Sequence, residues 1–265
     1  MAIIYMGICT PIVFGLFGRT LGQREEALRA SSQQIERLRE EFAAIVAHDL
    51  RNPINAMLLQ LEMLARGAAD GAVTVPVSTL QKLRRSGERL TQMVNDLLDA
   101  TRIEAARLSL QPQSVSLPDA VRNLVDRIRL TLGSHTVDVT VEGQPPRVAA
   151  DPARLDQILT NLVENAAKYS EEGTPILIRI RPEGAGARIS VEDRGIGIAN
   201  DELPKLFDRF YQAKRARQKK SGLGLGLYIT KGLVDAHRGQ IRVESVPDRG
   251  STFDVWLPAQ PERAS

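Results

Sequence analysis

The segment from Phe42 to Ile54 places a histidine, a carboxylate and an amide on one expected helix. His48 is followed directly by Asp49, and Asn52 lies four residues on, one helical turn away on the same face. A neutral imidazole is a nucleophile near pH 7, and an adjacent carboxylate can fix its tautomer and raise its basicity. These residues predict covalent chemistry at His48, whereas the alternative is an ordinary surface histidine on a helix.

The helices that would carry these residues are indicated by an apolar repeat upstream of them. Every seventh position is apolar at Leu21, Leu28, Ile35 and Phe42, and three residues on at Leu38 and Ile45. Such a repeat predicts helices that pair lengthwise, with His48 beside the seam. We expect one helix over residues 23–66 and a second, amphipathic helix over 78–107, forming a hairpin that a second copy of the chain completes as a four-helix bundle.

The second half of the chain mixes strand and helix patterns. We expect strands over residues 136–141, 176–181, 188–192, 241–246 and 252–257, and helices over 119–132, 151–168, 201–211 and 225–236. This mixture predicts an α/β sandwich, with helices on one face of a mixed sheet, over residues 119–258. Residues 108–118 contain two prolines and read as the linker from the helical region 19–107, and 259–265 as a tail.

A polar stripe occupies the helix expected over residues 151–168. Asn161, Asn165 and Lys168 follow one another at spacings of four and three, and Tyr169 comes next. An amide oxygen suits Mg²⁺, a lysine can meet phosphate, and a tyrosine ring can stack on a base. The stripe therefore fits a nucleotide site, although a solvated helix face has the same pattern.

Asp193 ends an expected strand and is followed by Gly195 and Gly197. A carboxylate there can accept a hydrogen bond from an exocyclic amino group, and the glycines let the backbone approach a ligand closely. Asp-x-Gly-x-Gly on its own also fits a plain turn.

Three further glycines, Gly222, Gly224 and Gly226, stand directly before the last expected helix. Exposed amides at a helix N-terminus favour an anion. The segment has no Gly-Lys-Ser/Thr and no strand leading into it, so it is neither a P-loop nor a dinucleotide fingerprint.

The span from residue 200 to 221 separates these glycine segments and ends in a basic run. Five of the seven residues from Lys214 to Lys220 are basic. The run fits a flap over a triphosphate, a solvated charge run or a nucleic-acid contact. Because it contains no aromatic residue, base stacking is disfavoured and we predict no nucleic-acid partner.

Composition limits the remaining classes. The 265 residues are 43% apolar and 25% charged with a net charge of +3, which is typical of a globular protein. The single cysteine excludes an internal disulfide framework, and the three histidines have no metal-ligand spacing. Residues 1–18 carry no charge and are followed by Arg19, Arg24 and Arg29. They predict a membrane anchor with the rest of the chain cytoplasmic, the alternative being a buried apolar tail.

Five segments in order resemble a two-component sensor histidine kinase over residues 30–258. They read His-Asp-Leu-Arg-Asn-Pro from position 48, Asn-Leu-Val-Glu-Asn-Ala-Ala-Lys-Tyr-Ser from 161, Asp-Arg-Gly-Ile-Gly from 193, Phe-Asp-Arg-Phe from 207 and Gly-Leu-Gly-Leu-Gly-Leu from 222. The resemblance implies a dimeric helical domain with the phosphoacceptor His48, followed by an ATP-binding domain of the gyrase-like (Bergerat) type.

The resemblance also implies roles for single residues. Asn165 would hold Mg²⁺ and Asp193 would read the adenine amino group, with Gly195 and Gly197 lining the base pocket. Gly222, Gly224 and Gly226 would face the phosphates across a lid formed by residues 200–221. Arg209 would be a γ-phosphate contact.

Two positions bear on the reaction type. Related ATPases place a water-activating glutamate four residues before the Mg²⁺ asparagine, where this chain has Asn161, which favours phosphoryl transfer to His48 over hydrolysis. Leu223 stands where many relatives have Ser or Thr, but the backbone amides remain.

The resemblance implies autophosphorylation of His48 from Mg-ATP and transfer to an aspartate of a response-regulator receiver domain, with Asn52 orienting water for dephosphorylation of that partner. A degenerate kinase acting as a nucleotide-binding scaffold and a gyrase-like ATPase are the alternatives. The stimulus, the regulator and whether each subunit phosphorylates itself or its mate are not indicated.

Overall fold

The computed structural model describes residues 46–66, 75–129, 132–219 and 223–260. The chain divides into two compact units, Met1–Asn52 and Pro53–Ser265. The predicted apolar segment 1–18, the whole seven-residue repeat from Leu21 to Ile45 and Gly222 lie outside the described residues. Within the described ranges, none of the helices combines the length and the apolarity needed to cross a bilayer.

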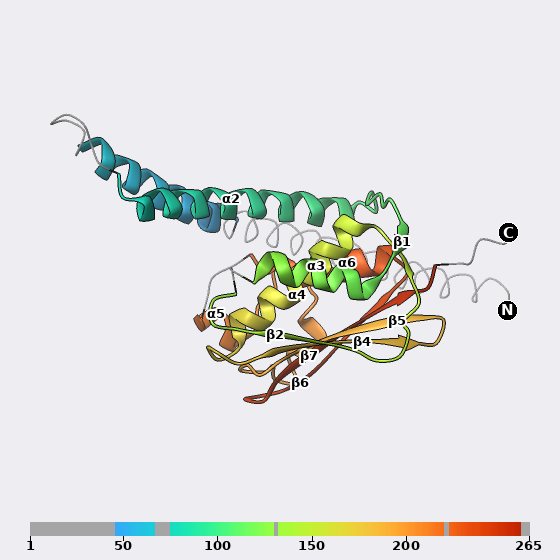
Figure 1. The fold of residues 1–265 in the computed structure, drawn as a ribbon. Helices are drawn as coiled ribbons and strands as arrows, with labels where there is room; N and C mark the ends of the chain where they lie inside the picture. Colours follow the sequence, from blue (N-terminus) through green and yellow to red (C-terminus); the bar gives the residue numbers. More distant parts are fainter. Residues whose placement is uncertain (1–45, 67–74, 130–131, 220–222, 261–265) are drawn as a thin grey trace, which may run out of the picture. The chain divides into compact units, whose positions relative to one another are not determined.

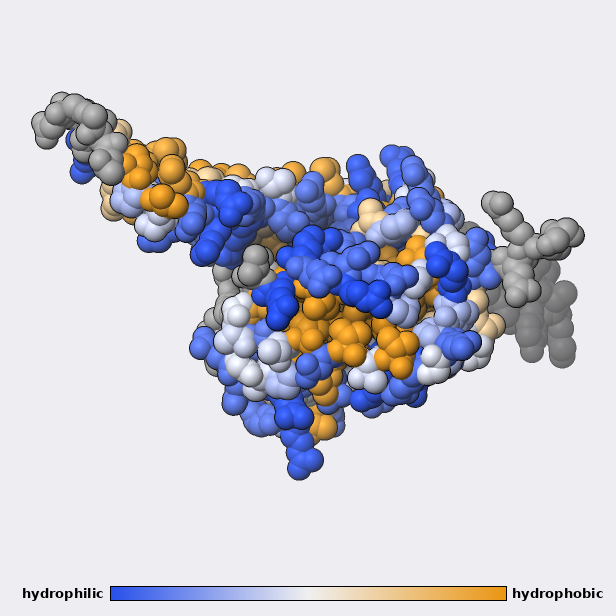
Figure 2. All heavy atoms as spheres, viewed as in Figure 1, coloured by the Kyte–Doolittle hydropathy of each residue, from blue (hydrophilic) through white to orange (hydrophobic). Residues whose placement is uncertain are grey.

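The predicted helical hairpin is present. Residues 46–66 are helical, and the second helix, α2, spans Val77–Glu104, close to the predicted 78–107. Its N-cap position is Pro76, which makes no side-chain cap, and Ser78 lies within the first turn of the helix. Large apolar side chains stay exposed along residues 53–66 and α2, where Figure 2 shows an apolar surface; they are Ile54, Leu58, Leu59, Leu61, Met63, Val77, Leu80, Val94 and Leu98.

A five-stranded mixed sheet forms the base of the α/β region, as predicted (Figure 1). Its strands lie in the order β2 (Val137–Val141), β4 (Ile176–Glu183), β5 (Gly186–Asp193), β7 (Gly250–Pro258) and β6 (Gln240–Val246). The β2–β4 pair is parallel and every other pair in this sheet is antiparallel.

Three helices cover one face of this sheet: α3 (Leu117–Ile128), α4 (Pro152–Tyr169) and α6 (Gly226–Ala236) (Figure 1). Alternate residues of β4 point into the layer between sheet and helices, where Ile176, Ile178 and Ile180 are fully or almost fully buried. Leu155, Ile158, Leu159, Leu162 and Val163 of α4 are buried as well. Each such side chain contributes roughly 1.5–3 kcal/mol by leaving water, so this layer fixes α4 on the sheet.

The start of α4 is fixed by polar contacts. Asp151 accepts hydrogen bonds from the backbone N–H groups of Ala153 and Arg154 at 3.0 and 3.2 Å, and Pro152 occupies the first turn. His237, at the end of α6, donates from Nδ1 to the Leu233 carbonyl at 2.7 Å and accepts at Nε2 from the Asp151 N–H at 3.0 Å. Both ring nitrogens of His237 are therefore bonded inside the fold, which gives this histidine a structural role.

Two short strands and one helix differ from the sequence-based expectation. The strands β1 (Gln113–Val115) and β3 (Val148–Ala150) pair with each other, and three residues are too few to show an alternating pattern. The helix predicted over residues 201–211 is wrong, because only Leu203–Lys205 form a short 3-10 helix, η1.

Residues 202–214 form no continuous helix because hydrogen bonds join the two ends of this segment and fold it into a loop. The buried Glu202 carboxylate accepts from the Tyr211 hydroxyl at 3.0 Å and from the Lys214 N–H at 2.9 Å, and Phe210 has a φ of 64°. A short helix, α5, follows at Lys214–Lys219, within the basic run.

Candidate active site

A cavity of about 730 Å³ lies beside the C-terminal half of α4, in the unit Pro53–Ser265. It is lined by the end of α4, the end of β5, the loop before α6, segment 206–216 and one face of α2. Seven of the residues predicted from sequence line it together: Asn165, Lys168, Tyr169, Asp193, Gly197, Gly224 and Gly226. These seven residues come from three separate chain segments and thus meet at one hollow of the size of a small-molecule site.

The end of α4 supplies an amide, a cation and an aromatic ring. Asn165 and Lys168 lie one helical turn apart, and the Lys168 ammonium stands 5.0 Å from the centroid of the Tyr169 ring. Directly after the helix, Ser170 forms a β-bridge with Gly195, which ties α4 to the Asp193–Gly197 segment. The amide oxygen can bind a metal ion, the ammonium can bind a phosphate, and the aromatic ring can stack on a base.

Asp193 is the buried carboxylate of the cavity, with 7% of the residue exposed. Burial raises the pKa of Asp193 to about 6, although the backbone N–H groups of Gly195 and Ser251 lower it by hydrogen bonding. The Gly195 N–H donates to Asp193 Oδ1 at 2.8 Å. Ionised near neutral pH, this carboxylate is an acceptor held in a fixed direction at the cavity wall.

The glycines next to Asp193 are required by close backbone contacts. A Cβ on Gly195 would lie 2.5 Å from the Tyr169 carbonyl oxygen and 2.7 Å from Asp193 Oδ1. Gly197 has a φ of +62°, and a Cβ there would lie 2.1 Å from the Val246 carbonyl oxygen. Gly195 does not line the cavity but shapes the turn that holds Asp193, and Gly197 lines it directly.

The glycine loop before α6 meets the cavity from the other side. Gly224 has a φ of +66°, and its carbonyl accepts from the Phe210 N–H at 3.1 Å. Gly226 begins α6, so its amide is among the N–H groups that a helix leaves without an intrahelical partner. The loop therefore combines backbone donors with the positive end of a helix dipole, which suits an anionic ligand.

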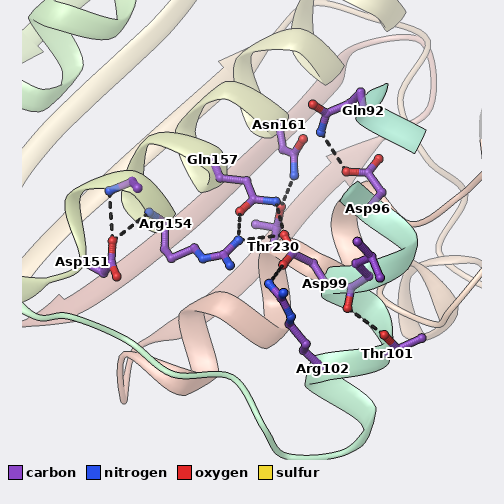
Figure 3. Close-up of polar contacts among 12 residues, drawn as sticks. Gln92, Asp96, Asp99, Thr101, Arg102, Asp151, Arg154, Gln157, Asn161 and Thr230 are labelled. Atoms are coloured by element: carbon purple, nitrogen blue, oxygen red, sulfur yellow. Dashed lines mark hydrogen bonds and ion pairs between the residues drawn. The ribbon is translucent and has the colours of Figure 1, made fainter. Parts of the chain in front are cut away.

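Two predicted residues lie elsewhere. Asn161 does not line the cavity: its amide donates to the Gly226 carbonyl and to Thr230 Oγ1, both at 3.4 Å, and so links α4 to α6 (Figure 3). Arg209 does not line it either, because its guanidinium donates to the Glu104 carboxylate at 2.8 Å and lies 4.7 Å from the centroid of the Phe210 ring.

The histidine segment is described at residues 46–52 of the other unit. His48 Nδ1 lies 3.0 Å from Asp49 Oδ1, and the His48 side chain is 71% exposed while that of Asp49 is 11% exposed. Since a carboxylate can only accept, Nδ1 carries the proton of this bond, and in the neutral imidazole Nε2 keeps its lone pair. The helical backbone also places the exposed Asn52 one turn from His48.

Residues of α2 that the sequence did not point to also line the cavity. They are Arg89, Gln92, Met93 and Asp96. Their spacing alone reads as part of an amphipathic helix, and nothing in it shows which neighbour the polar face meets. Only the packing of α2 against α4 and α6 reveals their position.

Comparisons with known proteins match both regions. Residues 38–106 match the His Kinase A (phospho-acceptor) domain, and residues 150–261 match the histidine kinase-, DNA gyrase B-, and HSP90-like ATPase family. The chain belongs to the sensor histidine kinases. It is 34% identical over 252 residues to the circadian input-output histidine kinase CikA of Synechococcus elongatus, covering 92% of this chain but 33% of that protein.

Solved structures of histidine kinases share this fold. Full-length ShkA in complex with AMPPNP is similar with a TM-score of 0.61 and 31% identity, covering 85% of this chain and 48% of ShkA. Histidine kinase ThkA in complex with the response regulator protein TrrA has a TM-score of 0.60 at 23% identity, covering 84% of this chain and 62% of that one, which shows likeness of fold alone. This histidine kinase chain therefore spans about a third to three fifths of the length of these relatives.

The residues at the cavity also fit a magnesium ion brought by a nucleotide. Asn165 presents an amide group at the wall, and amide oxygen is a suitable hard ligand. No three His, Cys, Asp or Glu side chains cluster as a metal site in the described part of the chain. Mg²⁺ needs no such cluster, because it usually keeps its waters and substrate phosphates as ligands.

Proposed function

We propose that this chain is an ATP-dependent protein histidine kinase that transfers the γ-phosphoryl group of ATP to His48. The observation that carries the proposal is the cavity at which Asp193, Asn165, Lys168 and the glycine loop meet. Adenine requires a buried hydrogen-bond acceptor held in one direction and an aromatic ring to stack on. A triphosphate requires cations and N–H groups that bind its oxygens. The similarity to ShkA, whose structure contains AMPPNP, supports the assignment of the nucleotide.

In the proposed reaction, His48 Nε2 forms a bond to the γ-phosphorus, and the bond from that phosphorus to the β–γ bridging oxygen breaks. ADP leaves with the electron pair of that bond. Nδ1 keeps its proton, and the positive charge that develops on the ring is stabilised by the Asp49 carboxylate at 3.0 Å. Such transfers depend mainly on positioning and charge stabilisation.

The cavity residues that were predicted from the sequence have separate proposed roles in binding ATP. Asp193 accepts from the adenine amino group, Lys168 and the Gly224 and Gly226 segment bind phosphate oxygens, and Asn165 would hold Mg²⁺. When bound, Mg²⁺ supplies charge neutralisation at the phosphates. Arg209 is paired with Glu104 in the structure and would have to leave that pair to reach a γ-phosphate.

The phosphoryl group on His48 is proposed to pass to an aspartate of a response-regulator receiver domain. The ThkA–TrrA complex supports this kind of partner for the fold. Asn52, one turn from His48, would orient a water molecule for the opposing reaction, in which the regulator is dephosphorylated. Replacing Asn52 with Ala should spare labelling of His48 and abolish the phosphatase activity, and loss of both activities would contradict this role.

We further propose that the chain acts as a homodimer and that residues 1–18 attach it to a membrane. The exposed apolar side chains of residues 53–66 and α2 support the dimer, because a second hairpin would bury them in a four-helix bundle. The membrane proposal depends on sequence alone. Flotation of the full chain with lipid vesicles, compared with a chain lacking residues 1–18, tests it, and equal flotation would remove it.

Incubation with γ-³²P-ATP and Mg²⁺ tests the central proposal. Wild type should gain an acid-labile, base-stable label that His48→Gln lacks. His135→Gln is the matched control, since His135 bonds the Thr174 carbonyl at 3.0 Å away from the cavity, and it should retain the label. A wild-type chain without label, or a His48→Gln chain that keeps it, would overturn the proposal.

A further inference from the structure

One face of helix α2 forms a wall of the nucleotide cavity. Arg89, Gln92, Met93 and Asp96 all line it, and their spacing of three, one and three residues places them on one helical face. The cavity is therefore not built by the α/β region alone. The helix that forms half of the histidine hairpin contributes to it directly.

Polar contacts hold α2 in this position (Figure 3). The buried Asp99 carboxylate accepts from Arg154 Nη1 at 2.7 Å and from Gln157 Nε2 at 2.9 Å, both on α4. One turn further along α2, the Glu104 carboxylate accepts from Arg209 at 2.8 Å. The wall is thus attached at the C-terminal half of α2, and its cavity-facing residues precede that attachment.

Apolar packing adds to this attachment. The Ile103 side chain lies against α6 so closely that a Cβ on Gly232 would be 2.7 Å from it. The pair therefore fits together only because residue 232 has no side chain, which fixes the position of α2 along α6. With the two polar contacts, it makes the placement of the cavity-facing residues specific.

Arg89 and Lys168 lie at similar distances along their helices from the contact between Asp99 and Gln157. From the shared contact at Asp99, Arg89 lies ten residues back along α2, or roughly 15 Å at the helical rise. Lys168 lies eleven residues forward from Gln157 along α4, which is about the same length. Both residues line the same cavity, whose wall therefore carries cations from two different helices.

The charges along this wall suit an anion at Arg89. Gln92 Nε2 donates to the carboxylate of Asp96 at 2.8 Å, which directs that carboxylate along the helix. Burial raises the pKa of Asp96, and neighbouring Asp99 adds to the rise, while the Gln92 hydrogen bond works against it. Arg89 supplies the guanidinium of this wall, and the planar fork of a guanidinium matches the geometry of phosphate oxygens.

We propose that Arg89 of α2 is a phosphate-binding residue of the nucleotide site, so that α2 completes the site when it is seated on the α/β region. The proposal rests on the nucleotide site assigned above and adds a residue from the hairpin to it. Because Arg89 reaches the ligand only in the seated arrangement, nucleotide binding and seating stabilise each other by the same free energy.

Calorimetric titration of the full chain with AMPPNP and Mg²⁺ tests this assignment. Arg89→Ala should weaken AMPPNP binding about three- to tenfold, since it removes one charge-assisted hydrogen bond from a partly solvated site. Adenosine, which has no phosphate, should bind both proteins equally. Arg89→Lys should restore part of the loss because the charge returns without the planar fork.

Arg84→Ala is the matched control, because Arg84 is on the same helix, pairs with Glu88 at 3.4 Å and does not line the cavity. Its AMPPNP affinity should equal that of wild type. In an Asp99→Ala background, which removes one of the contacts that seat α2, Arg89→Ala should cause a smaller further loss of AMPPNP affinity than it causes in wild type. This non-additivity is the signature of coupling.

Different results would refute the role of Arg89, the coupling to the position of α2 and the proposed function. Equal AMPPNP affinity of Arg89→Ala and Arg84→Ala would overturn the assignment, as would a loss for adenosine equal to that for AMPPNP. A full Arg89→Ala effect in the Asp99→Ala background would overturn the coupling. A wild-type chain that binds no AMPPNP would instead refute the proposed function itself.

Discussion

Replacement of Asp193 with Asn should stabilise the protein and weaken its nucleotide binding at the same time. Burial raises the Asp193 pKa from 3.8 to about 6, which means that the folded protein pays to keep this carboxylate ionised. One pKa unit corresponds to about 1.4 kcal/mol, so the cost reaches about 3 kcal/mol above pH 6. Asn has no charge to bury, and its amide oxygen can still accept from the Gly195 N–H.

The pH dependence follows from the same shift. A raised carboxyl pKa contributes stability that is fully present below the unfolded value of 3.8 and is lost as the pH rises through about 6. The advantage of Asp193→Asn should therefore be largest at pH 7, about half as large at pH 5 and absent below pH 3.8. Urea unfolding of both proteins across this range measures it, with exposed Asp138→Asn as the control.

The binding cost of the same change has the opposite sign. The Asn amide can direct an N–H group toward the adenine amino group, so AMPPNP affinity should fall by about tenfold or more. If Asp193→Asn were less stable than wild type at pH 7, or if its advantage did not change with pH, the assignment of a buried ionised carboxylate would be refuted.

Four further changes test the elements that position the site and the proposed dimer. Asp151→Ala should lower the free energy of unfolding by about 1 kcal/mol by removing the α4 cap, whereas Ser116→Ala, whose side chain makes no cap bond, should not. Although burial raises the Asp151 pKa, hydrogen bonds from backbone N–H groups lower it by more. The stability lost in Asp151→Ala, measured by urea unfolding, should therefore shrink as the pH falls below 3.8. Gly87→Ala in α2, where a Cβ meets nothing within 4 Å, should stabilise by about 0.5–1 kcal/mol; Gly195→Ala should destabilise and lower AMPPNP affinity, and equal effects would contradict the close contacts at Gly195. Leu80→Glu should shift the chain from dimer to monomer in sedimentation, and an unchanged dimer would argue against the four-helix bundle.

Much of the architecture follows from local patterns. The α2 and α4 helices, the strands β4 and β5 and the β6–β7 hairpin all lie within a few residues of their predicted ranges, because their apolar positions repeat with the period of a helix or a strand. The elements that differ are short or irregular. Residues 201–211 carry a helix-like pattern, but the Glu202 hydrogen bonds to Tyr211 and Lys214 turn this segment back on itself.

The sequence by itself determined which chemically capable side chains share one helix, because His48 with Asp49, and Asn165 with Lys168, are neighbours along single helices. Their relation is set by helical geometry and needs no knowledge of the rest of the chain. Only the tertiary structure decided the remaining partners: Asn161 donates to α6, Arg209 pairs with Glu104, and Arg89 of α2 lines the cavity. Each of these contacts joins residues far apart in sequence, and which of several equally polar surfaces meet depends on how the buried apolar faces pack.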